Sequence, residues 1–434
     1  MKFRYNKLHG LLISLVIAFA AYSLAGELPD QGRLALALSL LTVALWVANV
    51  FPLEITSILY SVLLVVCKVL PPPEAFSGYS NPTPWFILSV LIFGFAVNNS
   101  GLGRRLSLYL SNALGVTFKG MLMAIFAVGS ILSFLTPAGV ERILILYPLA
   151  LAAAVAIMGE KMAGSNVTKL SMSVAYISGN TLGFGILTGT AVNILALGVI
   201  NQVAGLTIYW TQWFVWFYVP INLTALISIF ILVKIYPPEQ TQVIGGRESI
   251  KEDFLAMGKI TPQELKTAMF LLMAVLLWTT DKFHGLPPWA VGVFIATLMT
   301  APVIGCLKAE NIKAIPSNIV VVSAAAITLG GVMQATGVGE WMGRETLGRF
   351  IQPGMSTSVA SAITFLTATV LHIPLVESNT TVAGFVPVVV NYFHSMGMPV
   401  VGPALMAVMA GLTIAFVPFM VIPAILMVGF GEHF

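Results

Sequence analysis

A short polar run inside a long apolar region places the strongest constraint on how this chain can fold. The run Glu377-Ser378-Asn379-Thr380-Thr381 stands between the apolar stretches 362–370 and 382–387. At membrane depth, hydroxyl and amide side chains of this kind are expected only where the chain turns to line a polar cavity. A second polar, glycine-rich run, Gly183 to Asn193, interrupts the other half of the chain. The pattern predicts two breaks in otherwise membrane-embedded helices.

The amino-acid composition indicates that the chain is a membrane protein. Charged residues make up 9% of the chain, against roughly 25% in soluble domains. Hydrophobic residues make up 58%, and the mean hydropathy is +0.94. These values predict an all-α polytopic membrane protein in a lipid bilayer. The net charge of +4 does not indicate nucleic acid, because the basic residues lie in short loops. Cys67 and Cys306 stand alone in apolar segments, which favours buried thiols over a disulfide or metal site.

Several apolar segments are too short for a helix of roughly 20 residues that crosses a bilayer. The pairs 119–135 with 140–158 and 355–371 with 380–394 each flank a polar break. We expect them to form re-entrant hairpins, each of which enters and leaves on one side of the membrane. Two full spans in place of either hairpin would give the same charge distribution, so the hairpins depend on segment length and polarity alone.

Basic residues predict the orientation of the chain. With the N-terminus in the cytoplasm, most Lys and Arg residues lie in cytoplasmic segments, as the positive-inside rule requires. The apolar run Leu11–Ala25 follows Lys2, Arg4 and Lys7. We interpret it as an uncleaved first span in preference to a signal peptide, because further apolar segments follow at once. The expected location is the bacterial inner membrane.

The two halves of the chain resemble each other. Val43–Trp46 pairs with Val275–Trp278, Phe93–Gly103 pairs with Leu329–Gly339, and Pro148 pairs with Pro387. The offsets of 232, 236 and 239 residues drift slowly, as expected for a diverged duplication. Under the predicted topology the repeats are inverted. The predicted organisation is an extra span at 1–32, a first repeat at 33–236 with a broken helix at 171–203, a cytoplasmic loop at 237–266, and a second repeat at 267–434 with a broken helix at 403–430 and its last span missing.

The sequence resembles the divalent anion:sodium symporter family, on three motifs. These are the Ser378-Asn379-Thr380 run before Pro387, the Gly-x-Gly-x-Leu-x-Gly-Thr-x-x-Asn loop ending at Asn193, and the Ser100–Arg105 turn. The resemblance implies a secondary transporter of small anions, such as di- or tricarboxylates or sulfate. It further implies sodium symport or anion exchange, an elevator-type movement and a homodimer. Sodium would be the coupling ion, and no other cofactor is expected.

Hairpin tips and broken helices also supply the candidate site. The start of a half-helix presents free N–H groups and a dipole that favour an anion, and broken helices expose carbonyl oxygens that suit a small cation. The candidate substrate ligands are Ser378, Asn379, Thr380, Thr136, Arg142, Thr190 and Asn193. The candidate sodium ligands are Thr188, Gly189, Asn193, Ser133 and Glu377. Alternatively, the hydroxyl groups only bond back to their own helices and the glycines only allow close packing.

The chain departs from the family pattern in the first hairpin and in the last predicted broken helix. The first hairpin carries Leu135–Arg142 where a second Ser-Asn-Thr run is expected, and Phe416–Ala424 lacks the expected Pro-Pro-Asn. Arg142 costs about 2.5–3.5 kcal/mol at membrane depth, so it needs a partner or an aqueous cavity. It either binds a substrate carboxylate or pairs with Glu141 or Glu377.

Two other kinds of function are open to a helical membrane protein of this composition. A cation or proton antiporter, or an arsenite-type exporter of the same superfamily, would use Glu141 and Glu377 as ion carriers. An intramembrane enzyme would need a nucleophile and base, or a metal set. The five histidines form no His-x-x-x-His pattern, and no Gly-x-Ser-x-Gly run is present. The sequence therefore predicts a transporter and not an enzyme.

Overall fold

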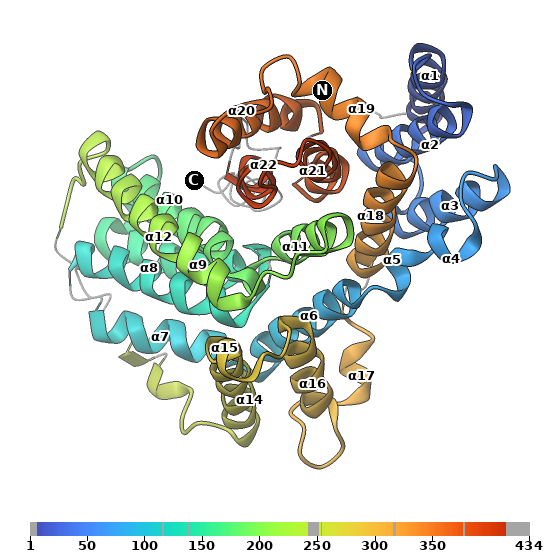
Figure 1. Cartoon of the computed structure of the whole chain (residues 1–434). Coiled ribbons are helices and arrows are strands. Elements are labelled where there is room, and N and C mark those ends of the chain that lie inside the picture. The colour runs from blue at the N-terminus through green and yellow to red at the C-terminus, as the bar shows by residue number, and fades with distance from the viewer. Residues whose placement is uncertain are drawn as a thin grey trace. The chain divides into compact units, whose positions relative to one another are not determined.

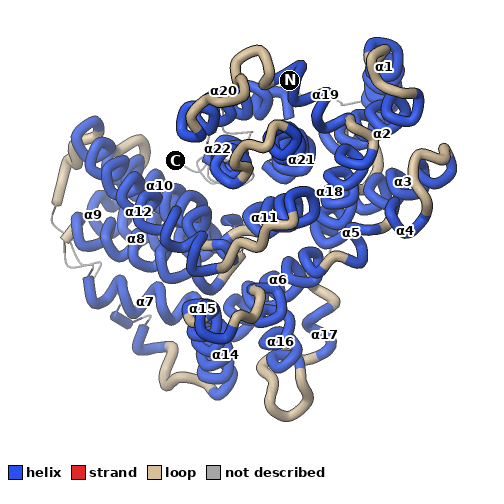
Figure 2. Tube along the Cα trace, viewed as in Figure 1, coloured by secondary structure: helices blue, strands red, loops and turns tan. Residues whose placement is uncertain are grey.

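The computed structural model describes residues 7–114, 117–137, 139–241, 251–252, 254–315, 318–375 and 378–413. Within these ranges the regular structure is helical and contains no β-strand (Figure 2). Six of the described helices are long and apolar enough to cross a membrane. They are α1 (Lys7–Leu24), α2 (Asp30–Val47), α6 (Pro82–Ser100), α8 (Phe118–Leu135), α12 (Trp210–Ile235) and α18 (Asn318–Ala335). The predicted all-α polytopic fold is confirmed.

The chain divides into two compact units, of which the first comprises Met1–Ile87, Val192–Ile208 and Pro316–Met420. It contains α1, α2 and α18 and most of α11 (Ala191–Ala204). Its other helices are α3 (Leu53–Val66), α4 (Pro72–Ala75), α5 (Ser77–Ser80), α19 (Val338–Thr346), α20 (Thr357–Leu375), α21 (Ser378–Ser395) and α22 (Val401–Thr413).

The second unit comprises Leu88–Ala191, Tyr209–Ile315 and Val421–Phe434. It contains most of α6, together with α8 and α12. Its other helices are α7 (Leu102–Leu114), α9 (Gly139–Met158), η1 (Gly159–Met162), α10 (Asn166–Asn180), η2 (Thr181–Gly185), η3 (Leu187–Gly189), α14 (Pro262–Thr279), α15 (Asp281–His284), α16 (Pro288–Thr300) and α17 (Ala309–Ile312).

Helix positions recur along the chain at a nearly constant offset. α14 begins and ends 232 residues after α2, and α18 begins 236 residues after α6. Each hairpin's second helix, α9 or α21, carries a proline as its tenth residue, Pro148 or Pro387. The first unit combines α2 and α3 of the first predicted copy with α18–α22 of the second, and it also holds most of α11. The second unit combines α7–α10 and α12 of the first predicted copy with α14–α17 of the second. The inverted relation of the copies stays a prediction.

In the first unit, α18 packs against α3, α5, α19 and α21. The backbone N–H of Gly78 in α5 donates to Thr328 Oγ1 of α18 at 3.1 Å. A Cβ at Gly78 would lie 1.9 Å from the carbonyl oxygen of Ala324, so only glycine permits this approach. α20, α21 and α22 pack against one another (Figure 1). The second predicted hairpin therefore belongs to a three-helix group.

In the second unit, aromatic rings connect the first predicted hairpin to α12. Trp210 of α12 stacks on Phe214 with ring centroids 5.3 Å apart, and Phe214 stacks on Tyr218 at 4.5 Å. Phe134, next to the end of α8, lies within 6.2 Å of Trp210. Trp278 of α14 stacks on Trp210 at 6.3 Å. Large rings of this kind bury much apolar area at low entropic cost, which favours a rigid support for the hairpin tip.

Side-chain caps set where three helices begin. Thr117 accepts from the N–H of Gly120 at the start of α8, and Ser165 accepts from Thr168 at the start of α10. Thr261 and Glu264 form a reciprocal capping box at the start of α14. This box starts α14 at Pro262.

Candidate functional site

The tip of the first hairpin is a short connection between two helices. α8 ends at Leu135, Thr136 has extended backbone angles, and α9 begins at Gly139. Ser133 Oγ donates to the carbonyl oxygen of Gly129 at 2.8 Å, and Thr136 Oγ1 donates to that of Leu132 at 3.0 Å. Both hydroxyl hydrogens are thus used within α8. Each hydroxyl oxygen can still act as an acceptor.

A break between α10 and α11 faces this tip within the second unit. α10 ends at Asn180, the chain continues through η2 and η3, and Thr190 is extended before α11 begins. Two indole N–H groups of α12 hold the break: Trp210 donates to Thr188 Oγ1 at 3.3 Å, and Trp213 donates to the carbonyl oxygen of Phe184 at 3.1 Å. One backbone carbonyl and one hydroxyl group of the break are thereby satisfied by buried indole groups.

Arg142, in the first turn of α9, joins the tip to the break. Its side chain is 0% exposed. Nε donates to the carbonyl oxygen of Gly179 at 2.6 Å. Nη1 donates to the carbonyl oxygens of Thr136 at 2.6 Å and Gly189 at 2.8 Å. Nη2 is buried and has no hydrogen-bond partner among the residues that the structure describes. Most of the guanidinium is therefore engaged by backbone carbonyls.

Glu141 lies beside Arg142 in sequence but forms no ion pair with it. Its Oε2 atom is buried and has no hydrogen-bond partner within the described ranges. A Cβ at Gly94 of α6 would lie 2.5 Å from that oxygen, so the carboxylate packs directly on the α6 backbone. A buried carboxylate oxygen without a hydrogen-bond donor lowers the stability of the folded protein, and such oxygens are rare in native structures.

The tip of the second hairpin lies in the first unit. α21 begins at Ser378, whose Oγ donates to the carbonyl oxygen of Gly411 in α22 at 2.7 Å. His372 Nδ1 of α20 and Thr381 Oγ1 of α21 lie 2.7 Å apart and bridge the two arms of the hairpin. Ser378, Thr380 and Thr381 are buried. The start of α21 therefore presents polar side chains in a packed setting.

The predicted ligands are divided between the two compact units. Ser133, Thr136, Arg142, Thr188 and Gly189 belong to the second unit. Ser378, Asn379, Thr380 and Asn193 belong to the first. Thr190 also belongs to the second unit, whose segment Leu88–Ala191 ends one residue later. Asn193 is buried in the first turn of α11. Glu377 and the predicted broken part of 403–430 beyond Thr413 lie outside the described residues. The assignment of all these residues as ligands stays a prediction.

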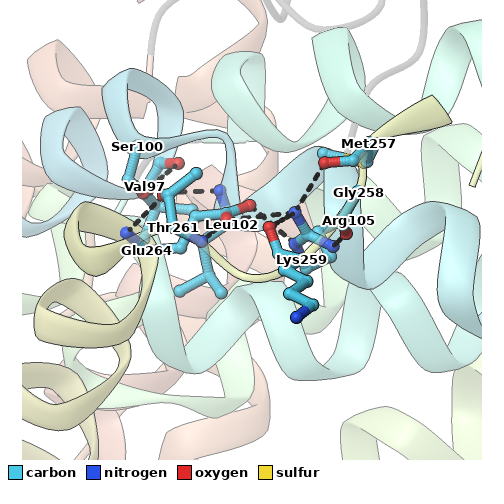
Figure 3. A network of polar contacts seen from close by, with 9 residues as sticks. All are labelled: Val97, Ser100, Leu102, Arg105, Met257, Gly258, Lys259, Thr261 and Glu264. Atoms are coloured by element: carbon cyan, nitrogen blue, oxygen red, sulfur yellow. Dashed lines mark hydrogen bonds and ion pairs between the residues drawn. The ribbon is translucent and has the colours of Figure 1, made fainter. Parts of the chain in front are cut away.

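Sequence reasoning missed the polar network shown in Figure 3. Arg105 Nε donates to Glu264 Oε1 at 2.8 Å, and Nη2 donates to Oε2 at 3.1 Å. The same guanidinium donates to the carbonyl oxygens of Met257, Gly258 and Lys259. Hydrogen bonding from Arg105 to the Glu264 carboxylate lowers the pKa of that carboxyl below its usual range. The Thr-x-x-Glu pattern at 261–264 is the sequence signal that could have located this network.

An open recess beside this network has a volume of about 760 Å³. Its lining includes Asn99, Gln263, Lys266, Cys306 and Lys308. Lys266 Nζ donates to the carbonyl oxygens of Val303 and Gly305, so its charge is partly engaged. None of the predicted ligands lines this recess. It is therefore distinct from the candidate site.

Together, the helix breaks and polar tips define a multi-pass helical membrane protein of the secondary-transporter class. The profile of the sodium:sulfate symporter transmembrane region matches residues 5–433. The chain belongs to this family.

Three relatives illustrate the similarity. A protein named only as a membrane protein, from Cupriavidus necator, is 23% identical over 347 residues, covering 79% of this chain and 66% of its own. The sodium-dependent dicarboxylate transporter SdcS of Staphylococcus saprophyticus is 24% identical over 382 residues, covering 82% and 72%. SdcS of Staphylococcus aureus strain USA300 is 24% identical over 344 residues, covering 74% and 65%. The match to this last relative spans about two thirds of its length.

Proposed function

We propose that this protein is a secondary active transporter of small anions, di- or tricarboxylates or sulfate, coupled to sodium or working by anion exchange. Membership of the sodium:sulfate symporter family over residues 5–433 carries the proposal. The similarity to SdcS, a sodium-dependent dicarboxylate transporter, supports a dicarboxylate and sodium as first choices.

In this proposal the anion binds at the tips of the two hairpins. The start of α21 carries the polar side chains of Ser378, Asn379 and Thr380, and the dipole of a helix favours an anion at this end. At the first tip, Thr136 and Arg142 would contribute, although only Nη2 of the guanidinium lacks a partner within the described ranges. Thr190 and Asn193 would complete the substrate site at the start of α11.

Sodium would bind where helices break and leave carbonyl oxygens exposed. Thr188, Gly189, Asn193 and Ser133 are the proposed ligands, together with Glu377. In this proposal the hairpins move against a scaffold in an elevator-type cycle. The protein forms a homodimer in the bacterial inner membrane, and its N-terminus lies in the cytoplasm.

Uptake by proteoliposomes tests the proposal. Purified protein is reconstituted, and uptake of labelled succinate, citrate and sulfate is measured with and without an inward sodium gradient. We expect uptake of at least one of these anions, driven by sodium or by a counter-anion inside the vesicle. Vesicles without protein are the control. Absence of uptake and of exchange for all three anions would contradict the proposal.

The buried carboxylate of Glu141 favours a second candidate, a cation or proton antiporter. Its unpartnered Oε2 atom is suited to carry a proton or hold a cation. A Glu141→Gln variant separates the two functions. Under antiport, the variant should abolish ion exchange measured with a pH-sensitive dye. Under anion transport, sodium-driven uptake should persist with altered affinity.

A further inference from the structure

The open recess beside the Arg105–Glu264 pair contains none of the residues assigned to transport. It has a volume of about 760 Å³ and lies where the start of α14 meets the loop that follows α16. α14 and α16 pack side by side within the second unit (Figure 1). Among the described residues that line the recess are two basic side chains, Lys266 and Lys308, and no aspartate or glutamate. The recess therefore favours a negatively charged group.

Side chains of α14 hold the loop at the edge of this recess. Lys266 Nζ donates to the carbonyl oxygens of Val303 at 3.0 Å and Gly305 at 3.3 Å. Gln263 Nε2 donates to the carbonyl oxygen of Cys306 at 3.2 Å. An ammonium group carries three N–H donors, so Lys266 can hold the loop and still donate to one further acceptor. The loop is thus fixed while a positive charge stays at the recess.

The loop presents large apolar side chains next to these lysines. Val303 is 94% exposed and Ile304 is 52% exposed. Val303 also has a φ of +71°, a left-handed conformation that β-branched residues rarely adopt. Strained backbone persists only where its surroundings impose it, and such strain is concentrated at functional sites. Here the hydrogen bonds from α14 hold an apolar surface beside two positive charges.

We propose that this recess binds the headgroup of an anionic phospholipid. The phosphate accepts hydrogen bonds from Lys266 and Lys308, and the acyl chains lie against Val303 and Ile304. A free anion would gain nothing from the two apolar side chains, so their presence favours a lipid. The volume lies within the roughly 300–1,000 Å³ that is typical of small-molecule sites.

The position of the recess in the chain agrees with this ligand. The predicted topology places the start of α14 on the cytoplasmic side of the membrane. Anionic lipids give the cytoplasmic leaflet a negative surface potential, and basic recesses between transmembrane helices on that side bind anionic headgroups. This lipid site is separate from the proposed transport site and does not depend on it.

A lipid titration of the purified full-length protein in detergent tests the proposal. The probe is dioctanoyl phosphatidylglycerol, and dissociation constants are taken from the rise in Tm with lipid concentration. Dioctanoyl phosphatidylcholine has the same acyl chains without the net charge, and glycerol phosphate has the charge without the chains. We expect phosphatidylglycerol to bind at least about tenfold more tightly than either.

Lysine variants test the headgroup contacts. The double variant Lys266→Gln with Lys308→Gln should bind phosphatidylglycerol at least about tenfold more weakly than the wild type, because it loses two charges. Lys313→Gln is the matched control, since Lys313 is exposed five residues after Lys308 and does not line the recess. Its affinity should equal that of the wild type. Because Lys266 also holds the loop, Lys308→Gln alone decides if Lys266→Gln fails to fold.

Val303→Asn tests the contact with the acyl chains. Asparagine adopts the left-handed region readily, so the variant removes apolar surface without adding backbone strain. Its Tm without lipid should not fall. Its affinity for phosphatidylglycerol should fall about threefold or more, because less apolar surface is buried.

Several outcomes would overturn the proposal. Equal affinity for phosphatidylglycerol and phosphatidylcholine would show that charge is not recognised. Equal affinity for glycerol phosphate would identify a site for free anions instead of a lipid site. Wild-type affinity in either Lys308→Gln or Val303→Asn would remove the assigned contacts. A protein that transported no anion would still bind the lipid, so failure of the proposed function is distinguishable.

Discussion

The guanidinium of Arg105 and the carboxylate of Glu264 lie 2.8 Å apart although 159 residues separate them in the chain. The Glu264 side chain is only 2% exposed. The same carboxylate accepts from the N–H of Thr261 at 2.7 Å and so caps α14. One carboxylate thus joins α7 to the start of α14, within the unit that holds the first hairpin (Figure 3).

Replacing Glu264 by Gln should destabilise the protein. The substitution leaves the buried end of Arg105 without its charged partner and weakens the cap of α14. We expect a loss of about 3 kcal/mol, the usual cost of disrupting a buried charge-assisted pair. Thermal or denaturant unfolding in detergent measures it. Exposed Glu310→Gln is the control, and an equal effect in both variants would contradict the assigned role.

The same pair should make stability depend on pH. Hydrogen bonding from Arg105 lowers the pKa of Glu264 below its ordinary value of 4.5. The pair therefore contributes fully above that value, and its contribution is lost as the pH falls through the lower pKa of the folded protein. Between pH 6 and pH 3, the Tm of the wild type should fall more steeply than that of Glu264→Gln. If the Tm of both proteins fell equally with pH, the Arg105–Glu264 pair would not be the cause of the pH dependence.

Asn379 provides a direct test of the proposed anion site. Asn379→Ala removes an amide donor at the start of α21, and we expect the KM for the transported anion to rise at least about tenfold, which corresponds to about 1.4 kcal/mol. Ser395→Ala, at the other end of the same helix, removes a hydroxyl that only donates to the carbonyl oxygen of Tyr392. Its KM should remain unchanged. If both variants behave alike, Asn379 is not a ligand.

Gly183→Ala should be strongly destabilising because its Cβ would collide with Arg142. We expect a loss of about 2 kcal/mol or more, typical of forced displacement in a packed site. Gly331→Ala is the control, since its nearest contact would be an ordinary 3.5 Å to Gln202. In a double-mutant cycle with Arg142→Ala, the two effects should be strongly non-additive. Additive effects would show that the two groups do not interact in solution.

Much of the helix order could be predicted from the sequence. Apolar runs bounded by proline, glycine and charge located α8 with α9 and α20 with α21 to within a few residues of their observed bounds. The polar run ending at Asn193 likewise coincided with the observed break between α10 and α11. These features are local, because a polar or glycine-rich run interrupts a helix whatever it packs against.

The partners of Arg142 could not be predicted in the same way. Sequence reasoning considered a substrate carboxylate, Glu141 or Glu377, because only side chains are visible in a sequence. The observed partners are carbonyl oxygens of Thr136, Gly179 and Gly189, which every residue type possesses. Which carbonyl oxygens can accept a hydrogen bond from Arg142 depends on where neighbouring helices end in the folded protein.

The sequence alone determined that this is a helical membrane protein, because long apolar runs with few charges can satisfy their backbone groups in lipid by forming helices. Its division into two similar halves, with a polar break in each, stays a prediction. Only the tertiary structure decided which helices share a compact unit and what surrounds the buried arginine. Apolar helix faces in a membrane are chemically alike, so packing and carbonyl direction, not residue type, select their partners.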